Sequence, residues 1–151
     1  MNLGVRTSPT EVTFCVFDPQ EQNIKNISSI VVPKALTPPE QLKHIRLHIL
    51  DILREYKVTH AGIRTLEATA QSVTISRVQI EGVIQEAFAS SDIQSYYVGQ
   101  ISNISAKVGI PRTDFKLLVD GSKTLEGFEG WDDLSKEERE AALCAMGASN
   151  V

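Results

Sequence analysis

The pattern of apolar and polar positions predicts three short strands in the first 32 residues. Apolar residues recur in the segments NLGVR (2–6), EVTFCVFD (11–18) and NISSIVV (26–32), which the polar turn segments TSPT and DPQEQN separate. Strands joined by such short turns pair antiparallel. In the middle segment Phe14 and Phe17 fall on opposite faces, so both faces of that strand are expected to be covered. The pattern therefore predicts an antiparallel meander.

The segment 37–57 carries the strongest helix signal in the chain. Its start, TPPE (37–40), supplies an N-cap threonine, two prolines for the first turn and a glutamate that completes a capping box. The apolar residues that follow at helical spacing are Leu42, Ile45, Ile49, Ile52, Leu53 and Tyr56. Leu47 and Leu50 fall outside this stripe. They are either exposed leucines or one side of a subunit contact, and the second interpretation predicts a homodimer.

The remainder of the chain alternates between strand and helix patterns. Strands are predicted at 58–64 (VTHAGIR) and 93–100 (IQSYYVGQ), and helices over about 72–89, at 101–109 (ISNISAKVG) and from Ser135 onward. The helix over about 72–89 has an apolar side made of Val73, Ile80, Val83, Ile84, Ala87 and Phe88. Glycines and acidic residues favour a loop or a short hairpin over about 110–133.

These elements predict one α/β domain over residues 1–151. Strands separated by helices require right-handed parallel crossovers, whereas the first three strands are joined by hairpins. A mixed five-stranded sheet in the order 3-2-1-4-5 satisfies both conditions, with helices flanking it. The first strand is then central and lies beside the fourth, and the segment 110–133 is an insertion.

Composition narrows the range of functions. Of the 151 residues, 42% are hydrophobic, which suits a globular domain, and no apolar run is long enough to span a bilayer. The N-terminal segment lacks the features of a signal peptide, so a cytoplasmic protein without a membrane partner is expected. The net charge of −4 is unfavourable for tight, general binding of nucleic acid, but it is compatible with a local basic patch. Cys15 and Cys144 are expected to pack as small hydrophobic residues.

The candidate chemistry begins with two arginines. Arg6 and Arg64 each follow a short apolar run and end a predicted strand. Because these two strands are expected to be parallel neighbours, the two side chains should lie close together at one edge of the sheet. A guanidinium is always charged and cannot ligate a cation.

The chain resembles the ribonuclease H-like superfamily and, within it, the RuvC branch of the Holliday-junction resolvases. The resemblance rests on the order of the motifs NLGVR, REYKVTHAGIR, SYYVGQISNISAKVG and EREAALCAMGA. It implies the ribonuclease H-like fold. In that family, carboxylates at the ends of strands one and four and on the last helix hold two magnesium ions, which activate water and stabilise the leaving oxygen at a phosphodiester.

Arg6 and Arg64 stand at the ends of strands one and four, where the resemblance implies carboxylates. The chain therefore departs from the family at two positions that the metal-dependent mechanism requires. The last helix retains Glu137, Glu138 and Glu140, and Glu67 follows Arg64 by three residues. This departure favours a binding or scaffolding module that is inactive as a metal-dependent nuclease and needs no cofactor, with a nucleic acid or a protein as its partner. A divergent nuclease, with magnesium held by Glu67 and the three acids of the last helix, is the alternative.

Two interpretations of the arginine pair stay open. In the structural one, the arginines form internal ion pairs with Glu67, Glu138 or Glu140. In the functional one, they bind an anionic ligand or a nucleotide by guanidinium forks at the edge of the sheet. The residues predicted for such an anion site are Arg6, Arg64, Thr65, Gln100, Asn103 and Lys107.

Overall fold

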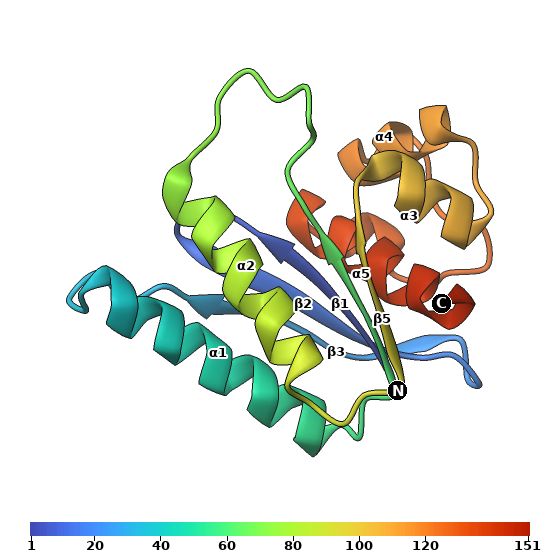
Figure 1. The fold of residues 1–151 in the computed structure, drawn as a ribbon. Coiled ribbons are helices and arrows are strands. Elements are labelled where there is room, and N and C mark those ends of the chain that lie inside the picture. The colour runs from blue at the N-terminus through green and yellow to red at the C-terminus, as the bar shows by residue number, and fades with distance from the viewer.

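The computed structural model describes residues 1–151, and its centre is a mixed five-stranded sheet with helices on both faces (Figure 1). The strands are β1 (Asn2–Thr7), β2 (Glu11–Asp18), β3 (Asn23–Val31), β4 (His60–Arg64) and β5 (Ser95–Gly99). Their order across the sheet is β3-β2-β1-β4-β5, which confirms the order predicted from the sequence.

The pairing of the strands brings one end of three strands to the same edge. β1 pairs antiparallel with β2 and parallel with β4, and β4 pairs parallel with β5. In the register between β1 and β4, Arg6 lies directly opposite Arg64. The carboxyl ends of β1, β4 and β5 therefore share one edge, and the two arginines are neighbours on it.

One face of the sheet is covered by α1 (Pro38–Glu55) and α2 (Ile75–Ala89). The predicted stripe of α1 is confirmed, with Ile45, Ile49, Ile52 and Leu53 buried against the sheet. Leu47 is exposed and Leu50 is partly buried, so neither interpretation of the two leucines is decided. Val73 does not belong to the apolar side of α2, because it precedes the helix and is exposed.

The other face is covered by α5 (Lys136–Gly147), with α3 (Ile101–Val108) and α4 (Arg112–Asp120) packed against it. Short 3-10 turns, η1 (Trp131–Asp133) and η2 (Ala148–Asn150), flank α5. Alanines let α5 approach the sheet closely, and β1 meets it at Gly4. Cys15 and Cys144 are buried in this layer as expected, and burial raises the pKa of Cys144 to about 12.

Residues 112–120, predicted to be part of a loop or hairpin, instead form α4. Phe115, Leu118 and Val119 recur at helical spacing and are buried, and Gly121 ends the helix with a φ of 84°. The loop was predicted because the glycines and acids that follow are typical of loops, and the helical period of the apolar residues before them is short. Trp131 is fully buried and its indole N–H donates to the Leu118 carbonyl, at 3.0 Å, so the segment folds tightly onto α4. No helix of the protein combines the length and the apolarity needed to cross a bilayer.

Replacing Gly4 tests the close contact between β1 and α5. A Cβ at this position would lie 2.0 Å from the Ala141 carbonyl oxygen and 2.2 Å from the Ala145 nitrogen, so Gly4→Ala must displace backbone atoms. We expect Gly4→Ala to lower the free energy of unfolding by about 3 kcal/mol, measured by urea denaturation. The control is Gly82→Ala in α2, where a Cβ meets nothing within 4 Å. That change should raise the free energy by about 0.5–1 kcal/mol. Equal effects would show that α5 does not approach β1 so closely.

Candidate functional site

The carboxyl edge of the sheet holds two arginines around one carboxylate. Arg6 Nε donates to Glu140 Oε2 at 3.1 Å, and Arg64 Nε lies 3.6 Å from the same oxygen. Glu140 comes from α5, whereas the arginines come from β1 and β4. The parallel register and the packing of α5 therefore create this three-residue contact, in which one glutamate faces two fixed cations.

The strand ends complete the contacts of the two guanidinium groups. Arg6 Nη1 donates to the Thr7 carbonyl at 2.7 Å, and Arg64 Nη1 donates to the Thr65 carbonyl. Arg64 Nη2 also lies 3.6 Å from Oε1 of Glu67. The internal ion pairs predicted from the sequence are thus confirmed for Glu140 and Glu67. Glu138 instead completes the capping box of α5, where its carboxylate accepts from the backbone N–H of Ser135 at 2.8 Å.

Glu67 ties the end of β4 to the beginning of α3. Its Oε1 accepts a hydrogen bond from the backbone N–H of Ile101, the first residue of α3, at 2.8 Å. Next to this contact, Gln100 Nε2 donates to the Leu66 carbonyl at 3.0 Å. The first turn of a helix has free N–H groups and a partial positive charge, which favour an anionic oxygen.

Two residues of α2 belong to the same edge and were missed in the sequence. Oε1 of Glu81 accepts from Thr7 Oγ1 at 3.1 Å and from Arg77 Nε at 3.0 Å, and the Leu66 N–H donates to it at 3.2 Å. Glu81 is only 5% exposed. The signal was present: Arg77 and Glu81 are four residues apart and continue the helical stripe that contains Ile84. A charged pair on an apolar stripe indicates a buried polar site.

We call the six charged residues at this edge the arginine–glutamate cluster: Arg6, Arg64, Arg77, Glu67, Glu81 and Glu140. Burial lowers the pKa of Arg77, and the positive charges of Arg6 and Arg64 lower it further, against the opposite effect of Glu81. The cations of the cluster therefore repel one another at Arg77, and Glu81 acts against this repulsion.

The other residues of the predicted anion site are only partly brought together. Thr65 and Gln100 lie beside the cluster, where the Thr65 N–H donates to the Gly99 carbonyl at 3.0 Å. Asn103 caps α3, since its Oδ1 accepts from the Gln100 N–H at 3.0 Å. Lys107, in the last turn of α3, donates to the Asn150 carbonyl at 3.1 Å and lies over the ring of Tyr97. Glu137, predicted as an acid of the alternative nuclease site, forms no ion pair.

The residues at this edge do not fit the pair of magnesium ions that the resemblance implies. Magnesium requires a shell of oxygen ligands, several of them carboxylates. Here the carboxylates of Glu67, Glu81 and Glu140 already accept from guanidinium, hydroxyl or amide groups, and three fixed cations stand among them. No three His, Cys, Asp or Glu side chains in the protein gather into a metal-binding group.

A basic hollow lies next to the cluster, at the beginning of α3. It has a volume of about 320 Å³ and is lined by Ile101, Arg112, Thr113 and Lys116. Arg112 and Lys116 are four residues apart on α4, are exposed and form no ion pair. Ile101 lines the hollow and also binds Glu67 through its N–H, so the hollow and the cluster share this residue.

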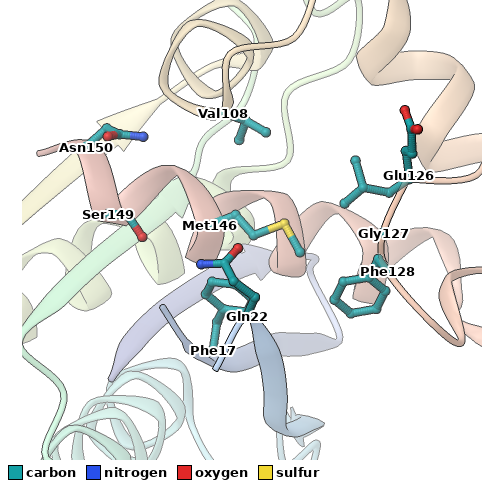
Figure 2. A pocket seen from close by; sticks show the side chains of 10 residues that line it. Phe17, Gln22, Val108, Glu126, Gly127, Phe128, Met146, Ser149 and Asn150 are labelled. Carbon is teal, nitrogen blue, oxygen red and sulfur yellow. The ribbon is translucent and has the colours of Figure 1, made fainter. Parts of the chain in front are cut away.

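Another pocket, of about 320 Å³, lies far from the arginines (Figure 2). Its walls include Phe17 of β2, Met146 of α5 and Phe128. Phe17 pairs with Asn2 at the amino end of β1, the end opposite to Arg6. The lining is largely apolar and amide-like and contains a single charged residue, Glu126, so it presents no set of converging catalytic groups.

Several solved structures of Holliday-junction resolvases are similar to this chain in fold. RuvC of Thermus thermophilus, in complex with Holliday junction substrate, has a TM-score of 0.72 and 10% identity over 97% of this chain and 90% of its own. A second structure of Thermus thermophilus RuvC has a TM-score of 0.68 and 10% identity over 97% of this chain and 92% of its own. The yeast mitochondrial Holliday-junction resolvase Ydc2 has a TM-score of 0.55 and 14% identity over 96% of this chain and 77% of its own. No protein-family model and no curated protein matches the sequence. The chain is therefore similar to RuvC-type resolvases in fold.

Removing Arg64 tests the contribution of the cluster to stability. Arg64→Ala leaves Glu67 without a guanidinium and Glu140 with Arg6 alone, at an edge where all these side chains are largely buried. We expect the free energy of unfolding to fall by about 3 kcal/mol, because the largely buried carboxylates of Glu67, Glu81 and Glu140 then share two guanidinium groups instead of three. The matched control is Arg54→Ala in α1, whose ion pair with Asp51 is exposed and should contribute little. Similar losses in the two variants, measured by urea denaturation, would contradict a structural role of the cluster.

Proposed function

We propose that this chain is a RuvC-like module that binds nucleic acid and does not cleave it by two-metal chemistry. The observation that supports this proposal most directly is the sharing of Glu140 by Arg6 and Arg64. Under the resemblance, these arginines stand where carboxylates would hold magnesium. The ion pairs with Glu140 then join β1 and β4 to α5 in the place of the metal ions.

Binding of nucleic acid is supported by the charges beside the cluster. Arg112 and Lys116 are exposed, unpaired and four residues apart, so both can reach the phosphates of one backbone segment. The overall charge of −4 is unfavourable for general binding, so the contact must be local. The relative solved with a Holliday junction makes branched DNA the first substrate to test.

The divergent nuclease remains the second candidate, and specific contacts weigh against it. Such an enzyme would use Glu67 together with the acids of α5. Glu138 is occupied by the N-terminal cap of α5, and Glu67 by the first turn of α3 and by Arg64. Both acids would have to leave stabilising hydrogen bonds before they could ligate a metal. A homodimer and a protein partner stay predictions from the sequence.

Charge reversal in the basic hollow tests the proposed binding. Arg112→Glu/Lys116→Glu should weaken binding of a four-way DNA junction by at least about tenfold, measured by fluorescence anisotropy at fixed salt, because two phosphate contacts are lost. The control Lys34→Glu/Lys43→Glu changes the net charge equally at exposed positions in and before α1, and should have a smaller effect. The intact chain should leave the junction uncut in magnesium or manganese. Cleavage, or equal loss in both variants, would contradict the proposal.

Replacing both strand-end arginines tests whether the edge is a converted metal site. Arg6→Asp/Arg64→Asp adds two carboxylates beside Glu140 and removes two cations. We expect manganese to raise the Tm of this variant by several degrees, because ions that bind only the folded state stabilise it. The intact chain and Arg6→Asn/Arg64→Asn, which lacks the added negative charges, should show no such rise. A folded aspartate variant that is insensitive to manganese would speak against a converted metal site.

A further inference from the structure

The arginine–glutamate cluster contains two buried guanidinium nitrogens that make no hydrogen bond. Each guanidinium has three nitrogens that carry protons. In the cluster only Arg6 Nε and Nη1, Arg64 Nη1 and Arg77 Nε donate hydrogen bonds. Arg64 Nε and Arg77 Nη2 are buried and make no hydrogen bond, since the carboxylate oxygen that Arg64 Nε faces, Glu140 Oε2, lies 3.6 Å away; Arg64 as a whole is 9% exposed. Buried polar groups nearly always have a partner, so these two nitrogens can donate to a further hydrogen-bond acceptor at this edge.

Shared contacts link the three arginines into one group. Arg6 and Arg64 both contact Glu140, and Arg77 contacts Glu81, which also binds the hydroxyl of Thr7 at the end of β1. The charges of Arg6 and Arg64 also contribute to the lowered pKa of Arg77. An additional anion would relieve this repulsion and would provide acceptors for the free N–H groups.

Glu67 shows how an anionic oxygen binds at the rim of the cluster. Its Oε1 accepts from the N–H of Ile101 at 2.8 Å and lies 3.6 Å from Arg64 Nη2. With 22% of its side chain exposed, it is the most accessible carboxylate of the cluster, compared with 14% for Glu140 and 7% for Glu81. It stands on the segment between β4 and α2, which arches away from the sheet in Figure 1. Glu67 can therefore be displaced with less loss of buried contact than the other two.

We propose that this edge is a metal-independent site for one phosphate group, and that Glu67 occupies part of it in the free chain. Arg64, Arg77 and the N–H of Ile101 supply the donors. A tetrahedral phosphate has more acceptor oxygens than the planar carboxylate that it replaces, so it offers the neighbouring guanidinium groups more hydrogen bonds. The inference rests on the proposed function only for the source of the phosphate, which the proposed function identifies as a nucleic-acid backbone. A free phosphate group has the same chemistry.

Titration of the purified chain with inorganic phosphate in the presence of a chelator tests this site. We expect saturable binding by the intact chain, and about tenfold tighter binding by Glu67→Gln, because one competing negative charge is removed from the site. Arg77→Gln should abolish binding, and its Tm in phosphate-free buffer checks that it is folded. The control Glu55→Gln removes a charge from an exposed position at the end of α1 and should behave like the intact chain.

The outcomes separate this inference from the proposed function. An oligothymidylate that competes with phosphate, and binds more tightly to Glu67→Gln, identifies the backbone as the source of the phosphate. Saturable phosphate binding without oligonucleotide or junction binding supports the site and overturns the proposed function. Junction binding that depends on Arg112 and Lys116 but is unchanged in Glu67→Gln and Arg77→Gln overturns the site and leaves the proposed function standing. Absence of saturable phosphate binding to both the intact chain and Glu67→Gln also overturns the site.

Discussion

The contact between one carboxylate and two arginines at the edge of the sheet is the constraint on which the rest of this structure depends. Arg6 and Arg64 lie opposite each other because β1 and β4 are parallel neighbours, so their positive charges are forced together. Glu140 of α5 compensates for both. The helix must therefore stay close to the sheet, which the alanines of α5 and Gly4 of β1 permit. Charge compensation and close packing thus depend on each other.

Buried ion pairs of this kind rarely add much stability relative to apolar residues, although breaking them is costly. A site that keeps three arginines and three glutamates at the edge of a sheet is therefore better explained by specificity or by function than by stability alone. The donors left over at Arg64 and Arg77 agree with this view. A core evolved only for stability would pair these groups or replace them.

The likeness to resolvases extends over nearly the whole chain, yet it concerns the path of the backbone and not the chemistry of the edge. A fold can serve many functions, and the function resides in the side chains that it positions. Here the positions that the resemblance assigns to metal ligands hold cations, and the neighbouring α4 adds two more. In our proposal, this scaffold carries positive charge at two strand ends and binds a phosphate group instead of hydrolysing a phosphodiester.

The sequence by itself determined the sheet order, the helix that follows the capping box at 37–40 and the position of Arg6 beside Arg64, because hydrophobic period, capping residues and chain connectivity are local or topological properties. It did not determine α4, whose short apolar period was outweighed by the glycines and acids that follow it. Nor did it determine the roles of Arg77 and Glu81, although their place on an apolar stripe was visible. Which of Glu67, Glu138 and Glu140 meets the arginines depended on where α5 and the first turn of α3 lie against the sheet. That choice is a matter of distances between segments far apart in the chain, and only the tertiary structure decides them.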